Sequence, residues 1–247
     1  MFCWYVRRGE TANVWRKAVL SVLFCLFLST HTVPAFAMKV QEVVSPKGIK
    51  AWLVEDHTLP LVAMQFGFRG GTAQDPAGKE GLTYFISTML DEGSGDLKSQ
   101  EFAERVQNLA ISMSFDASRD SFTGGIKTLT KNRGEAFRLL RTVLTAPRMD
   151  QDAVERMREA IVSSIKIDNE DPEKIATDAW FRMVFDGHPY ANAVKGNPAI
   201  ISSITSADLK AQVKRLFARD VLHVSVVGDI TPEELGKALD EVFGDLP

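Results

Sequence analysis

Strand-like and helix-like segments follow one another along this chain in an order that few folds can accommodate. Runs rich in β-branched and aromatic residues, or alternating in polarity, predict strands at residues 39–44, 49–54, 61–68, 111–117, 122–129 and 221–227. Stretches with helical periodicity separate or follow them, at residues 79–91, 99–109, 131–144, 151–167, 172–185, 207–217 and 233–243. Two of the strands are close neighbours, within residues 111–129. The order predicts an α+β domain in which a largely antiparallel sheet packs against helices.

The first 37 residues have the composition of a targeting segment. Basic residues come first, an apolar run of eleven residues follows at 18–28, and Ala35-Phe36-Ala37 is a small-x-small cleavage signal. The apolar run is well short of the ~20 residues of a membrane span. We expect a secretory signal peptide over residues 1–37, cleavage after Ala37, and a periplasmic or secreted protein that begins at Met38. An uncleaved membrane anchor is the alternative.

Removal of 37 of the 247 residues leaves enough chain for one domain with its own core, over residues 38–247. Both cysteines, Cys3 and Cys25, lie in the leader, so disulfides and thiolate metal sites are not expected in the mature protein. The formal net charge is −3 and the basic residues form no block. This composition argues against binding to nucleic acid and, once the leader is removed, to a membrane.

The segment from Gly81 to Ser94, GLTYFISTMLDEGS, has a helical pattern. Apolar residues recur at helical spacing and predict a buried stripe of Leu82, Phe85, Ile86, Met89 and Leu90. The polar residues Tyr84, Ser87, Thr88 and Asp91 fall on the other side. Taken alone, this pattern describes an ordinary amphipathic helix, since periodicity indicates burial rather than chemistry.

The same segment resembles the zinc-binding helix of the insulinase and pitrilysin metallopeptidases, which carries the motif His-x-x-Glu-His. The frame of that helix is kept at Gly81, Leu82, Phe85, Met89 and Leu90. The three positions that carry the chemistry hold Tyr84, Ser87 and Thr88 instead. In active members a glutamate about eighty residues downstream completes the zinc site, and Ser164 stands at that position here.

These replacements change the chemistry of the site. Two histidines four residues apart on one helical face can hold one zinc ion, and the glutamate activates the bound water. Tyrosine ionises only near pH ~10, and serine and threonine hydroxyls are neutral. The resemblance therefore implies a pseudo-peptidase with no catalytic residue, no metal and no other cofactor, whose degenerate positions are Tyr84, Ser87, Thr88 and Ser164.

The resemblance covers most of the chain after the leader. Residues 68–75, 187–196 and 222–235 resemble the loop before the zinc helix, a His-Pro-Tyr-Gly segment, and a closing strand, turn and helix. The edge strand that pairs with substrate in active members usually carries Asn-Ala, where this chain has Ser114 and Phe115. Phe115 either fills the space of a peptide or faces the core, and the core is the better interpretation.

Other chemical sites have weaker support. His57, His188 and His223 are scattered, and none pairs with another at ligand spacing on one element. His188 precedes a proline and is better explained as part of a turn. The acidic residues Asp168, Glu170 and Asp171 could suggest a hard-cation site, but a capping turn explains them better.

The resemblance implies a function in peptide processing or degradation. We expect a non-catalytic homologue that pairs with a catalytic insulinase-type subunit and helps to enclose a peptide substrate. One alternative is a stand-alone peptide-binding or scaffold module that adds an extended peptide to a sheet edge. Another is that the chain is a truncated half of a two-domain subunit, since family members commonly continue into a second, similar domain.

Overall fold

A computed structural model of the chain describes residues 17, 19–21 and 39–247. Residues 17 and 19–21 are helical, while most of the predicted signal peptide, including its cleavage position after Ala37, lies outside the described residues. Residues 39–247 form one compact unit and are described by themselves below. Within the described ranges, no helix combines the length and the apolar character that a bilayer span requires.

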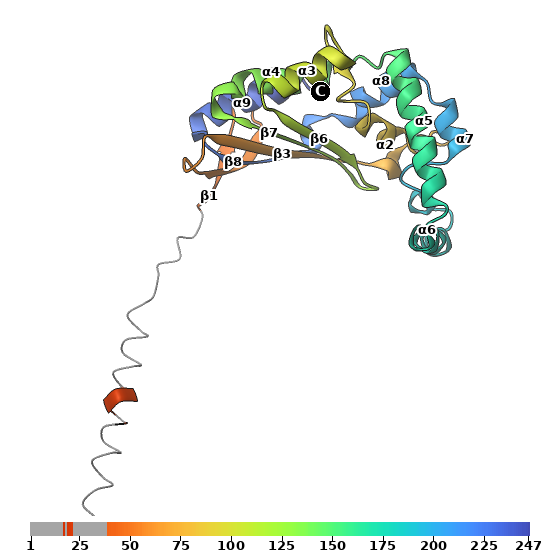
Figure 1. Cartoon of the computed structure of the whole chain (residues 1–247), viewed down its shortest axis with the longest axis horizontal. Helices are drawn as coiled ribbons and strands as arrows, with labels where there is room; N and C mark the ends of the chain where they lie inside the picture. Colours follow the sequence, from red (N-terminus) through yellow and green to blue (C-terminus); the bar gives the residue numbers. More distant parts are fainter. Residues whose placement is uncertain (1–16, 18, 22–38) are drawn as a thin grey trace, which may run out of the picture. The chain divides into compact units, whose positions relative to one another are not determined.

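A six-stranded sheet forms the body of this unit (Figure 1). Its strands are β1 (Val40–Val44), β2 (Lys50–Glu55), β3 (Leu61–Arg69), β6 (Ser112–Ala117), β7 (Ser121–Leu129) and β8 (Leu222–Gly228). They lie in the order β1-β2-β8-β3-β7-β6, and every neighbouring pair is antiparallel except β2 with β8. The predicted α+β class and largely antiparallel sheet are confirmed, with each strand within about two residues of its expected bounds.

Helices cover one face of the sheet and one of its ends. They are α2 (Leu82–Ser87), α3 (Ser99–Asn108), α4 (Arg133–Thr145), α5 (Gln151–Asp168), α6 (Pro172–Val184), α7 (Pro198–Ser203), α8 (Ser206–Leu216) and α9 (Pro232–Phe243). Figure 1 shows α3, α4 and α9 over the face, with α5, α6 and α7 gathered at the end. The short helix α7 and a two-stranded hairpin of β4 (Gly93–Ser94) and β5 (Leu97–Lys98) were not predicted, because elements of two to six residues leave little periodicity to detect.

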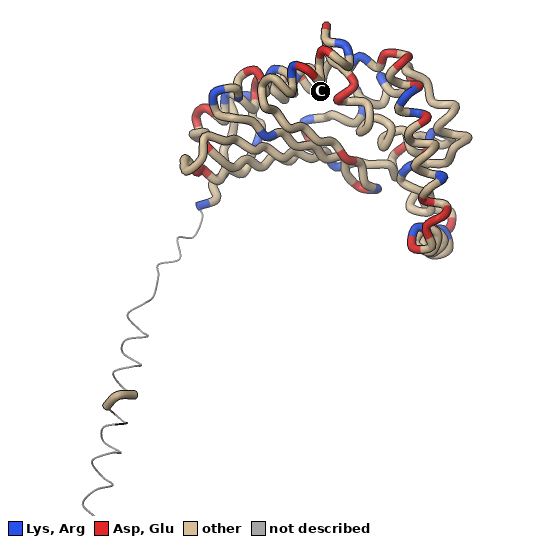
Figure 2. Tube along the Cα trace, in the orientation of Figure 1, with Lys and Arg blue, Asp and Glu red and all other residues tan. Residues whose placement is uncertain are grey.

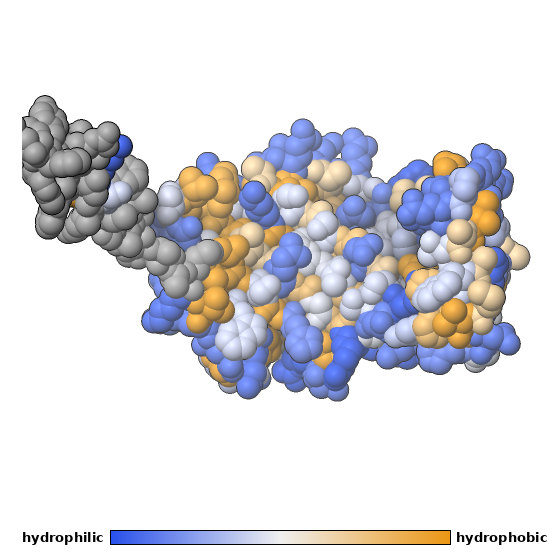
Figure 3. Space-filling model, turned by 90° about the horizontal axis from the view of Figure 1, so that it is seen from below, coloured by the Kyte–Doolittle hydropathy of each residue, from blue (hydrophilic) through white to orange (hydrophobic). Residues whose placement is uncertain are grey.

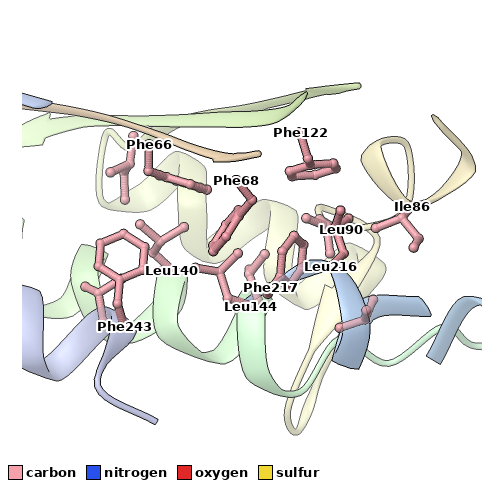
Figure 4. Packing of buried hydrophobic residues seen from close by; sticks show 14 of the residues in the cluster. Phe66, Phe68, Ile86, Leu90, Phe122, Leu140, Leu144, Leu216, Phe217 and Phe243 are labelled. Carbon is pink, nitrogen blue, oxygen red and sulfur yellow. The ribbon is translucent and has the colours of Figure 1, made fainter. Parts of the chain in front are cut away.

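The core lies between the sheet and the helices over it. In β3 the residues Val62, Met64, Phe66 and Phe68 are buried and alternate with more exposed neighbours, as a strand with one covered face requires. Figure 4 shows aromatic rings of the sheet pointing toward residues of the helices. The rings of Phe68 and Phe217 have their centroids 4.9 Å apart. Each such buried side chain stabilises the fold by roughly 1.5–3 kcal/mol.

The opposite face of the sheet has no helix lying over its strands within residues 39–247 (Figure 1). Trp52 of β2 and Val44 of β1 are more than half exposed there, at 56% and 54%. Seen from this side, apolar atoms gather at the β1 and β2 end and again at the far end of the unit, and more polar atoms lie between them (Figure 3).

Charged residues of both signs alternate over the helices and loops (Figure 2). Arg105 of α3 pairs with Glu135 of α4, and Arg141 of α4 pairs with Asp245, which follows α9. Such exposed pairs are worth about 0–1 kcal/mol each. The described part of the chain therefore presents mixed charge, in keeping with the absence of a basic block in the sequence.

Helix α2 is shorter and more deeply buried than the sequence predicted. The expected helix over residues 79–91 is wrong in its extent, because regular helix stops at Ser87 and turns follow. After Ser87 the backbone N–H groups donate three residues back, from Thr88 to the Phe85 carbonyl oxygen at 3.1 Å and from Met89 to the Ile86 carbonyl oxygen at 2.9 Å. The expected polar face is wrong at Ser87, which is only 7% exposed, while Tyr84 and Thr88 are half-buried and Asp91 is exposed.

Candidate functional site

The start of α2 is held by a carboxylate from the preceding loop. Asp75 accepts hydrogen bonds from the backbone N–H of Gly81 at 2.9 Å, from the N–H of Thr83 at 3.0 Å and from the Thr83 hydroxyl at 2.5 Å. Gly81 has no side chain with which to cap the helix, so Asp75 does this. Burial raises the pKa of the Asp75 carboxyl to about 6, although these hydrogen bonds act in the opposite direction.

The Thr83 hydroxyl continues this network into helix α8. It accepts a hydrogen bond from Nε2 of Gln212 at 3.2 Å, and Oε1 of Gln212 accepts one from Nη2 of Arg215 at 2.7 Å. Thr83 and Gln212 are both buried. A buried polar network with its members paired holds one arrangement, so the first turn of α2 is fixed against α8.

Of the three positions that the resemblance sets against His-x-x-Glu-His, two form hydrogen bonds within α2. Oγ of Ser87 donates to the Tyr84 carbonyl oxygen at 2.7 Å, and Oγ1 of Thr88 donates to the Phe85 carbonyl oxygen at 2.8 Å. Tyr84 is half-buried and packs against the core. The hydroxyl groups of Ser87 and Thr88 therefore bond within their own helix.

The fourth motif-equivalent position, Ser164 on α5, contacts a lysine ammonium. Nζ of Lys195 lies 2.6 Å from Oγ of Ser164 and 2.6 Å from Oδ2 of Asp168. The side chains of Lys195 and Asp168 are 27% and 29% exposed, so this pair is partly shielded from water. No local sequence pattern indicates this contact, because 31 residues separate Ser164 from Lys195.

These residues do not fit a zinc ion. Their groups are one phenol, two hydroxyls bound to their own helix and one hydroxyl bound to an ammonium, whereas zinc takes thiolates, neutral imidazoles and carboxylates. Within residues 17, 19–21 and 39–247, no three His, Cys, Asp or Glu side chains are placed to share a metal. Helices α2 and α5 do pack together, as a shared site requires. No catalytic step through a metal follows from this arrangement.

A cleft of about 680 Å³ opens beside Lys195. Its wall includes Glu80, Asp168 and Arg119. Arg119, which was not predicted, stacks its guanidinium on the Phe181 ring of α6 at 3.6 Å and donates to the Tyr190 carbonyl oxygen at 3.2 Å. These contacts attach α6 to the tip of the β6–β7 hairpin.

His188 and Asp171 have structural roles in the turns that contain them. Nδ1 of His188 accepts the backbone N–H of Tyr190 at 3.1 Å and caps a short 3₁₀ helix, so the turn interpretation is confirmed. The Asp171 carboxylate caps α6 by accepting the N–H of Glu173 at 2.9 Å. This confirms the capping explanation for Asp171, whereas Asp168 pairs with Lys195.

The edge strand β6 contains Ser114 and Phe115, the two residues at the positions where active members usually carry Asn-Ala. Phe115 lies 6.5 Å, ring to ring, from both Phe66 and Phe122, so it faces the core as expected. Ser114 points to the open face and is exposed. The side chain of Phe115 therefore does not block the outer edge of the strand.

A six-stranded sheet with helices on one face, and two packed helices at the motif-equivalent positions, together define a domain of the insulinase-type metallopeptidase class. Residues 50–197 match the sequence profile "Insulinase (Peptidase family M16)". The chain belongs to this family.

Its relatives include proteins described as inactive. The chain is 26% identical over 232 residues to the "Non-peptidase homolog YmxG" of Helicobacter pylori, covering 94% of this chain and 53% of that protein. It resembles the crystal structure of an inactive peptidase M16 domain from Pseudomonas fluorescens, with a TM-score of 0.80 and 25% identity, over 85% of this chain and 51% of that one.

Relatives in multi-subunit enzymes are more distant. The beta subunit of the mitochondrial-processing peptidase of Saccharomyces cerevisiae is 21% identical over 177 residues, which cover 72% of this chain and 38% of that protein. The chain spans about half the length, or less, of these relatives.

Proposed function

We propose that this chain is a non-catalytic member of the insulinase family that pairs with a catalytic subunit of the same family and helps to enclose a peptide. The hydrogen bonding of the motif-equivalent side chains carries this proposal. Ser87 and Thr88 are bound to their own helix, and Ser164 is bound to Lys195. A side chain committed in this way offers neither a metal ligand nor a general base.

The outward face of α6 supports the pairing. None of the residues of this helix is buried. Four of them are large apolar residues that are about half exposed or more: Ile175 (46%), Trp180 (51%), Met183 (75%) and Val184 (50%). Phe181 lies on the inward side, against Arg119. A helix that is apolar on both sides is typical of one covered by a further element. We call the four exposed residues the α6 patch.

The occupant we propose for the α6 patch is a companion domain of the insulinase fold that keeps the intact zinc motif. Two observations favour such a domain. The relatives above are about twice as long as this chain, and one of them is described as a subunit. The patch also lies at one end of the unit, on a helix whose other side lines the cleft beside Lys195, so a partner there would extend the domain at this end.

Affinity purification tests this proposal directly. The tagged chain is expressed from its own locus at native level, and the periplasmic fraction, where the leader predicts the protein to be, is purified and identified by mass spectrometry. We expect a stoichiometric homologue that carries His-x-x-Glu-His. Recovery of the chain without such a homologue, at native level and low salt, would contradict the pairing.

A second function has one observation in its favour. Strand β6 is at the edge of the six-stranded sheet, and its outer backbone groups have no neighbouring strand among the described residues. An extended peptide could add to this edge through main-chain hydrogen bonds. Binding of unstructured peptides by the purified chain alone, measured by fluorescence anisotropy, would favour this stand-alone module.

A further inference from the structure

Lys195 connects the two helices that carry the motif-equivalent positions. Its backbone lies against the start of α2, since a Cβ built on Gly81 would be 2.6 Å from the Lys195 carbonyl oxygen. Its side chain reaches α5, where it contacts Ser164 and Asp168. One residue of a loop therefore contacts both helices.

The ammonium occupies a site prepared on α5. Ser164 and Asp168 are four residues apart, so their side chains lie on the same face of the helix one turn from each other. Lys195 provides three N–H donors and no acceptor, and two of its donors have oxygen partners here. The result is a fixed positive charge in direct contact with the position where active relatives keep a metal-binding glutamate.

We infer that Lys195 is a built-in cation that joins α5 to the start of α2 in place of a metal and excludes divalent metals from this pocket. A metal and an ammonium in the same small volume repel each other, and the repulsion is strong where both are partly shielded from water. The inference does not depend on a partner subunit. It predicts that restoring the four ligand positions is not sufficient to restore metal binding.

The first experiment compares redesigned chains that differ at one lysine. The parent carries Tyr84→His, Ser87→Glu, Thr88→His and Ser164→Glu, and the second chain adds Lys195→Met. The matched control adds Lys79→Met to the parent instead. Nζ of Lys79 lies 3.0 Å from Asp208, and both of those side chains are 29% exposed, so the control removes a similar charge near α2 but outside the pocket.

Metal binding is read from the visible absorption of Co²⁺ and from Zn²⁺ competition with a chromophoric chelator. We expect the Lys195→Met chain to bind Zn²⁺ at least about tenfold more tightly than the parent. Changes to residues that surround metal ligands typically alter metal affinity by this factor or more. The Lys79→Met control should match the parent. Equal affinity with and without Lys195, or no binding by any chain, would overturn the inference, because the barrier to metal would then lie elsewhere.

A second experiment needs no redesigned site. Amide hydrogen exchange is measured on the natural chain and on Lys195→Met, Lys195→Arg and Lys79→Met variants. We expect Lys195→Met to accelerate exchange in residues 81–88 and 192–197 more than in the sheet, and Lys195→Arg to preserve protection because it keeps the charge. Unchanged protection in the Lys195→Met chain would show that Lys195 does not join these helices.

Discussion

Gly196 and Gly81 lie backbone against backbone. A Cβ built on Gly196 would lie 2.2 Å from the carbonyl oxygen of Glu80 and 3.2 Å from the Cα of Gly81. Both glycines have positive φ, +72° and +93°, a conformation that L side chains rarely adopt. This contact brings the loop of Lys195 close enough for its side chain to reach α5.

Gly196→Ala should therefore lower the free energy of unfolding by more than the strain of a positive φ alone. Gly187 is a matched control, because its φ is +73° and nothing lies within 4 Å of a Cβ built there. We expect Gly187→Ala to lower the free energy of unfolding by roughly 1–2 kcal/mol. Gly196→Ala should cost a further ~1–3 kcal/mol, because backbone must move to relieve the overlap. Urea unfolding measures both, and equal costs would show that the close approach does not matter.

Asp75 should make the protein less stable as pH rises through the mildly acidic range. The pKa of its carboxyl is about 6 in the folded chain, against 3.8 for the unperturbed group. Between these values the folded state binds more protons than the unfolded state, so the free energy of unfolding falls as pH increases. The free energy of unfolding is lowered by roughly 2–3 kcal/mol in total once pH is above the folded pKa.

Asp75→Asn removes this titration. We expect the difference in unfolding free energy between the natural chain and the variant to change between about pH 4 and 6 and to be constant above pH 7. Urea unfolding at four pH values measures it. A difference that does not vary with pH would mean that the buried carboxyl has the same pKa in both states.

His57 should also make the protein less stable as pH rises, but in a higher pH range than Asp75. Its Nδ1 and Nε2 lie 2.6 Å from Asp229 and 2.9 Å from Glu55, and these hydrogen bonds raise the pKa of the imidazole. A raised histidine pKa stabilises the fold fully below the unperturbed value of 6.5, and this contribution is lost as pH rises through the folded value.

His57→Gln keeps a hydrogen-bonding side chain without the charge. We expect the natural chain to lose stability relative to this variant as pH rises above 6.5, with the effect reduced at high salt because the group is exposed. An NMR titration of the His57 ring gives the folded pKa directly. A value at or below 6.5 would contradict the interpretation of both contacts.

The sequence predicted the sheet far better than the site. Strands such as β3 have one face in the core, so apolar residues recur at every second position of the sequence and predict the strand. Helix α2 also showed its apolar residues, but its regular part ends at Ser87, where the backbone N–H groups of Thr88 and Met89 bond three residues back, a change that periodicity does not report.

The partner of Ser164 could not be found from any local pattern. Lys195 reaches α5 because Gly196 allows its loop to lie against α2, which is a property of the folded backbone and not of nearby sequence. The family resemblance identified Ser164 as a position of interest and 187–196 as a related segment. It did not indicate that the two would meet, because a ligand position and a loop lysine carry no shared motif.

Charge placed on the α6 patch should separate association from folding. Met183 is 75% exposed, so Met183→Glu should change the free energy of unfolding of the isolated chain by no more than about 0.5 kcal/mol. The control is Leu59→Glu, which places the same charge on another exposed apolar residue, 61% exposed and in the β2–β3 loop. We expect Met183→Glu to reduce recovery of the companion homologue in affinity purification at least about tenfold, since a buried carboxylate without a partner is costly, and Leu59→Glu to leave it unchanged. Equal recovery with both variants would place the interface elsewhere on the molecule, and the uncovered face of the sheet would then be the next surface to test.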